Sequence, residues 1–185
     1  MLSRVWFACV FLGLYGACAS LSCRWMDHKF RQFSENSLNL LDVMANNSTN
    51  STEDEEENSV AFPHHLYSQA SRASAEEKVA FTAQVLKEAS ALLEEDDGSS
   101  SWDEGTAENF LSVVCKQAEE LLSCTGAHGH MKKKNTKLHL YFKRLSSHVL
   151  KRRGQSAEAW ELIRKEIRTH LMRVDLLISS LLAHN

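Results

Sequence analysis

The chain has 185 residues and a formal net charge of −3, and 43% of its residues are hydrophobic. A chain of this size and composition is long enough to form one domain with a real hydrophobic core. Its net acidic balance argues against a protein that binds nucleic acid through a basic surface.

The first residues have the pattern of a secretory signal peptide. Arg4 is the only charge before position 24, an apolar run over 5–15 follows it, and small residues end in Ala17-Cys18-Ala19. That run is too short to span a bilayer comfortably, which argues against a membrane anchor. We therefore expect residues 1–22 to be a signal peptide, cleaved between about 19 and 22. Residues 23–185 would then be a single secreted helical domain with no membrane insertion.

The two parts of this expected mature chain carry opposite charge. Residues 23–129 contain 7 Lys and Arg against 20 Asp and Glu, whereas residues 130–185 contain 13 against 4. Either the acidic and basic helices pack together and partly neutralise each other, or a basic face attracts an acidic protein partner. Composition alone leaves both interpretations open.

Apolar residues recur at steps of three and four in five segments, which is the period of amphipathic helices. The first segment is 23–45, and the loop 46–58 after it has no apolar residue and a run of acidic ones. Overlapping N-x-[ST] sequons make Asn46, Asn47 and Asn50 candidate glycosylation sites. We expect this loop to be solvated rather than part of the core.

The second and third helices have clear start signals. Ser74 and Glu77 form a capping-box pattern before a helix that ends by 96–98. The stretch 66–72 before it is either an irregular lead-in or a separate turn. Asp103 is the expected N-cap of the third helix, which ends near residues 124–126.

The fourth helix, 138–153, is basic and ends at Gly154, a residue suited to the left-handed C′ position. Ser156 is the expected N-cap of the fifth helix, 157–183, whose apolar stripe is uninterrupted by Gly or Pro. The two longest connections follow the first and third helices. Parallel neighbours require such crossovers, so we expect an all-α, five-helix up-up-down-down bundle with long crossover loops.

Three cysteines remain after the expected cleavage: Cys23, Cys115 and Cys124. An odd number in an oxidising compartment implies one bridge and one free thiol. Cys115 and Cys124 are separated by about 13.5 Å along one helix, whereas a bridge needs Cα atoms about 4.4–6.8 Å apart. Cys23 must therefore pair with one of them. We favour Cys23–Cys124, because Cys124 lies at the helix end and off the apolar stripe, whereas Cys115 borders it.

No catalytic or metal-binding motif is present in the sequence. It lacks G-x-S-x-G, H-E-x-x-H, C-x-x-C and a phosphate-binding glycine loop. His64-His65 and His128-Gly129-His130 could chelate a metal weakly, but loop histidines are more often simply solvated. We expect no enzyme, no catalytic residue, no cofactor and no metal site. The cluster Lys132, Lys133 and Lys134 predicts at most a weak glycosaminoglycan contact.

Several stretches resemble the type I interferons. The run 97–104, DGSSSWDE, followed by Asn109-Phe110, resembles the family's turn into its third helix. The run 141–144, YFKR, and the run 159–167, AWELIRKEI, resemble its fourth helix and the tryptophan-centred opening of its fifth. Phe62-Pro63 is similar to a Phe-Pro in the family's first long loop.

The resemblance implies a secreted antiviral cytokine of the helical-bundle type. Such a cytokine joins two class II cytokine receptor chains, whose kinases phosphorylate STAT factors and so induce antiviral genes. The family's bridge from the mature N-terminus to the end of the third helix falls on Cys23 and Cys124. Many mammalian members have a second bridge, but here Glu158 and the first long loop lack its cysteines. The chain is therefore most similar to the two-cysteine interferons of bony fish, which does not explain Cys115.

The resemblance also suggests receptor-binding residues. Arg164 occupies the position of a receptor-facing arginine of the family, with Lys165 and Arg168 beside it. We expect all three to lie on the solvent face of the fifth helix and to contact the receptor; the alternative is a face that only keeps the chain soluble. Trp160 lies on the apolar stripe and is assigned to the core. The arginine that mammalian members present before Phe-Pro has no counterpart in the acidic residues 53–58.

Other protein classes fit the sequence less well. A secreted helical lipid carrier would need an internal cavity, whereas these apolar stripes hold enough large side chains to fill a bundle. A secreted hydrolase would need a nucleophile and a base in a recognisable motif. Another long-chain cytokine or a type III interferon fits the helix pattern, but the Trp-Asp-Glu and Ala-Trp-Glu motifs favour type I.

Overall fold

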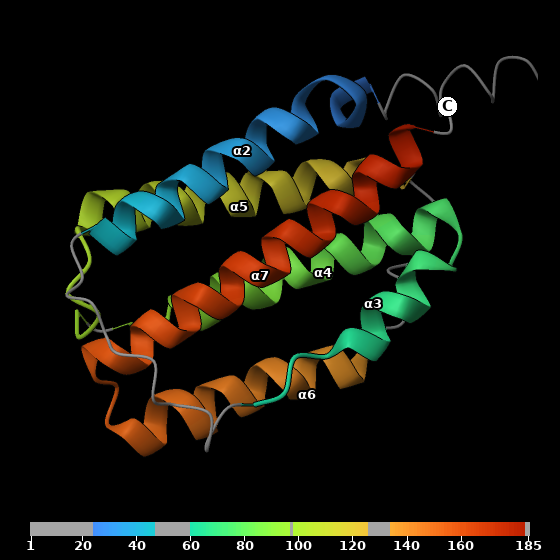
Figure 1. Ribbon diagram of the computed structural model, residues 1–185. Helices are drawn as coiled ribbons and strands as arrows, with labels where there is room; N and C mark the ends of the chain where they lie inside the picture. The colour runs from blue at the N-terminus through green and yellow to red at the C-terminus, as the bar shows by residue number, and fades with distance from the viewer. Residues whose placement is uncertain (1–23, 47–59, 97, 126–133, 184–185) are drawn as a thin grey trace, which may run out of the picture.

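The computed structural model describes residues 24–46, 60–96, 98–125 and 134–183, and within these ranges all regular structure is helical (Figure 1). The α-helices are α2 (Arg24–Asn46), α3 (His64–Ser71), α4 (Ala75–Leu93), α5 (Glu104–Ser123), α6 (Thr136–Arg144) and α7 (Ala157–Leu182). A π-helical stretch, Leu145–Leu150, and a 3₁₀ turn, Lys151–Arg153, continue α6.

Four long helices form the bundle. Helices α2 and α4 each pack against both α5 and α7. Figure 1 shows α2 and α4 running in one direction and α5 and α7 in the other. Each packed pair in this square is therefore antiparallel, while the diagonal pairs are parallel. This is the up-up-down-down arrangement, so the predicted fold class is confirmed.

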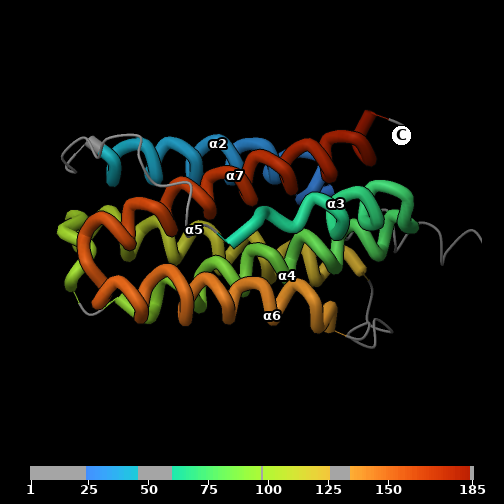
Figure 2. Tube along the Cα trace, turned by 60° about the horizontal axis from the view of Figure 1, so that its bottom comes forward, coloured from blue at the N-terminus to red at the C-terminus, as the bar shows by residue number. Residues whose placement is uncertain are grey.

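Two further elements cover the edge of the bundle between α4 and α7. Helix α3 contacts both of these helices, and α6 contacts α4 while its π-helical continuation contacts α7. Figure 2 shows α6 and α3 outside the four-helix square, on the same side as α4 and α7. Segments on both sides of the first long connection are thereby fixed to the final helix.

The predicted helix starts are confirmed by their hydrogen bonds. The hydroxyl of Ser74 accepts from the amide of Glu77 at 3.3 Å, and the carboxylate of Glu77 accepts from the amide of Ser74 at 3.1 Å. Asp103 and Ser156 each accept from the backbone amide three residues further on. These caps satisfy amides that the first turn of a helix leaves without partners.

The centre of the bundle is filled by large side chains. Trp160 is fully buried, as predicted, and its ring lies 5.7 Å from that of Trp102. Burying each such side chain stabilises the fold by roughly 1.5–3 kcal/mol. The largest fully buried side chains come from all four bundle helices and from α3, α6 and its continuation: Trp160, Phe30, Phe110, Leu41, Met44, Leu66, Leu86, Leu121, Leu138, Leu150, Ile163 and Ile167.

The fourth predicted helix is less regular than expected. The prediction was one α-helix over 138–153, whereas the α-helix ends at Arg144 and a wider π-helical turn follows. This turn buries Leu145, Val149 and Leu150 together and lets the hydroxyl of Ser146 donate to Glu95 at 2.7 Å. Gly154 then adopts φ +62°, the left-handed conformation predicted for it.

The stretch left open before the second helix is itself a helix. Helix α3 begins directly after Pro63, which lacks an amide that a helix start would leave unpaired, and it buries Leu66, Tyr67 and Ala70. Along the described ranges, no helix is long and apolar enough to cross a membrane. The expected signal peptide lies outside these ranges.

Candidate functional site

The three basic residues predicted to bind the receptor lie in the first half of α7, and two of them, Arg164 and Arg168, contact α2. The structure exposes two of them and buries the third. Arg164 is only 6% exposed, so the expectation that it lies on the solvent face is wrong. Its position on the helix places it between the apolar stripe and the surface, where α2 covers it.

Arg164 has a full set of buried partners. Its guanidinium donates two hydrogen bonds to the carboxylate of Glu161, from Nε at 2.8 Å and from Nη2 at 2.6 Å. Nη1 donates to the backbone carbonyl of Leu41 on α2 at 3.0 Å. Because planar, bidentate pairing suits a buried arginine, this residue ties the end of α2 to the start of α7.

Arg168 and Lys165 remain available at the surface. Arg168 is partly exposed and its Nε donates to Asp42 of α2 at 2.9 Å, while Nη1 contacts the sulfur of Met172 at 3.1 Å. Lys165 is exposed, and it lies one turn before Arg168. Ion pairs this exposed contribute little to stability, so the conformation of Arg168 can change at little cost.

Exposed apolar side chains accompany these charges. Val43, Met172 and Leu176 are 49%, 46% and 63% exposed. Met172 and Leu176 lie at helical spacing from Arg168, and Val43 follows Asp42 on α2. We call this surface the α2/α7 face and define it by Asp42, Val43, Lys165, Arg168, Met172 and Leu176.

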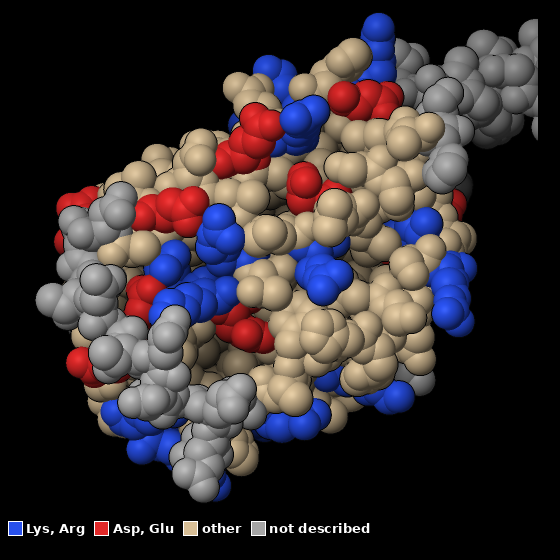
Figure 3. Space-filling view, viewed as in Figure 1, with Lys and Arg blue, Asp and Glu red and all other residues tan. Residues whose placement is uncertain are grey.

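The apolar part of this face was missed in the sequence. Met172 and Leu176 are one helical turn apart, and both fall off the stripe that faces the core. That pair of apolar residues on an otherwise polar face was the available signal. Figure 3, viewed as Figure 1, shows basic and acidic side chains intermixed where α2 and α7 lie.

A buried polar cluster lies under the C-terminal half of α7. His170 is fully buried, and its Nδ1 and the hydroxyl of Tyr67 on α3 form a hydrogen bond at 2.6 Å. The rings of Phe62, Tyr67, Tyr141 and Phe142 surround it, with centroids 4.7–5.8 Å away. The cluster joins α3, α6 and α7.

The burial of this cluster shifts its protonation equilibria. Burial lowers the pKa of His170 to about 3, so its ring is neutral. Its Nε2 lies 3.8 Å from the carboxylate of Glu166 and has no hydrogen-bond partner among the described residues. Burial also raises the pKa of Glu166, although a hydrogen bond from the hydroxyl of Tyr141 opposes this. The pKa values of both tyrosines are raised, chiefly by burial.

The remaining predicted residues stand as follows. Cys115 and Cys124 are not bonded to each other, as the spacing required, and Cys124 is the C-cap of α5. Cys23 lies outside the described ranges, so the Cys23–Cys124 pairing stays a prediction.

The candidate glycosylation and glycosaminoglycan residues are only partly described. Asn46 is the last residue of α2, while Asn47, Asn50, Lys132 and Lys133 lie outside these ranges. Lys134 is paired with Glu88 at 3.0 Å. Within the part described, no group of His, Cys, Asp and Glu could hold a metal ion.

Comparison with known proteins assigns the chain to a family. The family model described as the interferon alpha/beta domain matches residues 26–181. Interferon a3 of Oncorhynchus mykiss is 34% identical over 178 residues, which cover 95% of this chain and 96% of that one. The solved structure of zebrafish interferon 1 matches with a TM-score of 0.70 and 29% identity, over 85% of this chain and 98% of that one.

These matches agree with the family resemblance of the sequence and with the helical-bundle fold. Both named relatives are fish interferons, as expected from the absence of the second bridge. Interferons are cytokines rather than enzymes. The chain belongs to the interferon alpha/beta family and is a type I interferon of the fish kind.

Proposed function

We propose that this interferon is secreted and joins two class II cytokine receptor chains at the cell surface. The associated kinases then phosphorylate STAT factors and induce antiviral genes. In this proposal the α2/α7 face binds one of the two chains, through Arg168 and Lys165. The observation that carries the assignment is the exposure of Met172 and Leu176 beside these two cations.

The composition of the face supports this role. Protein interfaces are enriched in Arg and Met and have an apolar centre with a polar rim. Here Met172 and Leu176 would supply the apolar centre, and Lys165, Arg168 and Asp42 the rim. Arg164 acts as a positioning residue in this proposal, because it holds Leu41 of α2 against α7 and so fixes the relative placement of the two helices.

Other features of a secreted cytokine complete the proposal. The signal peptide over 1–22 directs the chain to the exterior, Cys23 pairs with Cys124, and glycans occupy one or more of Asn46, Asn47 and Asn50. The first sequon begins at Asn46, the last residue of α2, and we expect a glycan on only one of the adjacent Asn46 and Asn47.

The test is to treat cells of the source species with pure protein and to measure STAT phosphorylation and antiviral gene induction. Replacing Lys165 and Met172 with alanine should raise the half-maximal dose roughly tenfold or more, because Met172 lies at the apolar centre of the face, where a residue commonly contributes about 1.4 kcal/mol or more, and the rim loses the charge of Lys165. The melting temperature should change little, because both side chains are exposed.

The matched control replaces Lys116 of α5 and Leu140 of α6 with alanine, which removes one exposed lysine and one exposed apolar side chain elsewhere. This control should signal as the unmodified protein does. Equal loss in both double variants would show that the α2/α7 face has no special role. Absence of STAT phosphorylation with folded, unmodified protein would overturn the proposed function itself.

A further inference from the structure

The segment that contains α6 has an unusual charge distribution. Between Glu120 and Glu158 the chain carries nine Lys and Arg and no Asp or Glu. In the described part of this segment, one group, Lys134 and Lys151, pairs with carboxylates of the acidic part of the chain, whereas a second group of four other cations is exposed to solvent.

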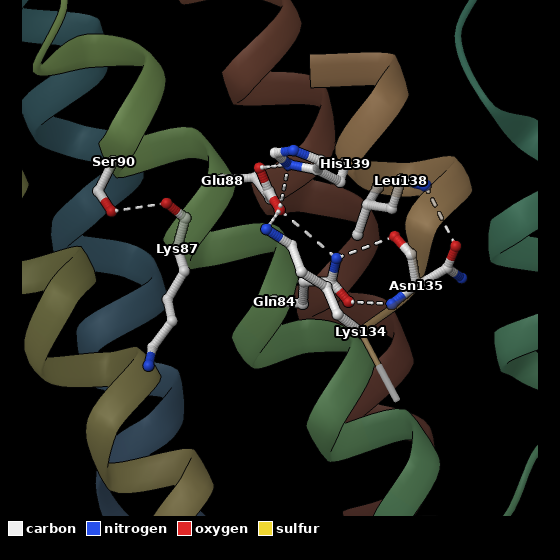
Figure 4. A network of polar contacts seen from close by, with 8 residues as sticks. All are labelled: Gln84, Lys87, Glu88, Ser90, Lys134, Asn135, Leu138 and His139. Carbon is white, nitrogen blue, oxygen red and sulfur yellow. Dashed lines mark hydrogen bonds and ion pairs between the residues drawn. The ribbon is translucent and has the colours of Figure 1, made fainter. Parts of the chain in front are cut away.

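The first group is represented by Lys134, which pairs with the carboxylate of Glu88 on α4. Figure 4 shows Lys134 and His139 directed at the carboxylate of Glu88, with Nζ of Lys134 at 3.0 Å and Nδ1 of His139 at 3.0 Å. Beside them the side chain of Gln84 accepts from the amide of Asn135 at 2.8 Å and donates to its carbonyl at 3.0 Å. The start of α6 is thus fixed to α4 by a local polar network.

This network also bears on the charge asymmetry of the sequence. Lys134 with Glu88, Lys151 with Glu95 and Arg168 with Asp42 all join the basic part of the chain to the acidic part. Part of the asymmetry is therefore neutralised inside the fold. The lysine of the predicted 132–134 cluster that the structure describes is already engaged in this way.

The second group consists of exposed cations of α6 and of the 3₁₀ turn that follows its π-helical continuation. Lys137, Lys143, Arg144 and Arg152 are exposed, and none of the four forms an ion pair with a described residue. Lys137 and Arg144 are seven residues apart, which is about two helical turns and places them on one side of the helix. Figure 3 shows basic side chains along the lower edge of the molecule, where Figure 1 places α6. We call these four residues the α6 basic face.

The α6 basic face has charge without an apolar centre. The large apolar residues Leu138, Tyr141 and Phe142 are buried in the core, and Leu140 is the one large apolar side chain exposed in the described part of α6. A membrane-binding helix would need its apolar side free, and a protein interface would need buried anchors. Exposed cations spread along α6 and the 3₁₀ turn after it, without an apolar centre, instead suit a linear polyanion.

We propose that the α6 basic face binds the sulfated glycosaminoglycan chains of cell surfaces. The guanidinium of Arg144 and Arg152 would pair with sulfate oxygens in bidentate fashion, and Lys137 and Lys143 would act as point charges. This face is separate from the α2/α7 face, so the same molecule can be held near the cell surface while its receptor-binding face stays free. The inference rests on α6 and the 3₁₀ turn Lys151–Arg153, and it is independent of the proposed receptor function.

The test measures binding of the full chain to immobilised heparin as a function of salt. Replacing Lys137, Lys143 and Arg144 with glutamine should weaken binding at least tenfold and lower the slope of log affinity against log salt by roughly one per lost contact. The control replaces Lys29, Lys87 and Lys116 with glutamine; all three are exposed, and Figure 4 shows the Lys87 side chain directed away from Glu88 and His139. The control should bind as the unmodified chain does.

Four outcomes would overturn the proposal. One is no retention of the unmodified chain at physiological salt, and another is equal loss in the two triple variants. A third is equal binding of desulfated heparin or of duplex DNA, since then sulfate is not what is recognised. The fourth is loss of STAT phosphorylation by the α6 variant on cells stripped of heparan sulfate, which would make the face a receptor contact. Retained signalling on such cells, with weakened heparin binding, supports the proposal whether or not the α2/α7 face binds the receptor.

Discussion

Arg164 and Glu161 form an ion pair whose members are 6% and 8% exposed. Helical spacing places Arg164 beside the apolar stripe of α7, where it needs polar partners. Because α2 packs over it, those partners lie inside the protein rather than in solvent. Removing one member of a buried pair leaves the other charge poorly solvated. We therefore expect the pair to stabilise the α2–α7 contact rather than to form part of the binding surface.

We expect Arg164→Ala to lower the free energy of unfolding by about 3–5 kcal/mol, because Glu161 loses its guanidinium and Leu41 loses a hydrogen bond. Lys165→Ala, one residue further on and exposed, should change it by no more than about 0.5 kcal/mol. Urea unfolding followed by circular dichroism measures both. A change of under about 1 kcal/mol for Arg164→Ala would mean that the side chain is solvated after all.

His170 makes stability depend on pH. In the unfolded chain an ordinary histidine binds a proton below about pH 6.5, whereas burial lowers the pKa of His170 to about 3 in the folded protein. Between these values the unfolded state binds more protons, so the free energy of unfolding falls as pH falls, by up to about 1.4 kcal/mol per pH unit from this group. Glu166, with its raised pKa, has the opposite effect, because it stabilises the fold at low pH.

The test compares the pH dependence of the free energy of unfolding between the unmodified protein and two variants. His170→Asn keeps a side chain that can hydrogen-bond to the hydroxyl of Tyr67 but cannot be protonated, and its stability should fall less steeply between about pH 6 and pH 4 than that of the unmodified protein. His148→Asn changes an exposed histidine and is the control. Two other groups near the cluster also shift its pKa values: His64 lowers the pKa of Glu166, and Arg173 lowers the pKa of Tyr67. Both groups are present in every variant. Parallel curves for His170→Asn and the unmodified protein would contradict the burial argument.

At the scale of elements, the sequence predicts best where the signal is local. The capping box at Ser74 and the caps at Asp103 and Ser156 depend on a few adjacent residues, and all are confirmed. The left-handed Gly154 is equally local and equally confirmed. Helix order and the bundle topology followed from apolar periodicity and connection lengths.

Features set by contacts between distant segments were predicted less well. The π-helical turn after Arg144 depends on how the fourth helix meets α4 and α7, and periodicity alone does not distinguish it from an α-helix. The burial of Arg164 depends on a carbonyl of α2, which is 123 residues away in sequence. For the candidate site, spacing and the resemblance predicted Lys165 and Arg168. The exposed Met172 and Leu176 were not predicted, although both are apolar residues that lie off the stripe.

At the scale of the whole molecule, the predicted bridge would join the start of α2 to the end of α5. Figure 1 shows that α2 begins at the end of the bundle where α5 finishes, and Cys124 packs against the core at that end. A bond to Cys23 would link the start of the mature chain to the middle of the sequence. In the chain-entropy account, closing a loop of about 100 residues stabilises the fold by about 4.7 kcal/mol.

We expect Cys124→Ser to lower the free energy of unfolding by about 2–5 kcal/mol under oxidising conditions, and to have little effect once the unmodified protein is also reduced. Cys115→Ser should cost less in both conditions, because the half-buried Cys115 acts only as a small apolar side chain. Denaturant unfolding with and without reductant gives the four values, and mass analysis after proteolysis identifies the bonded pair. A larger loss for Cys115→Ser, or a fragment that joins Cys23 to Cys115, would assign the bridge to the other cysteine. The N-terminus would then be attached to the middle of α5 rather than to its end.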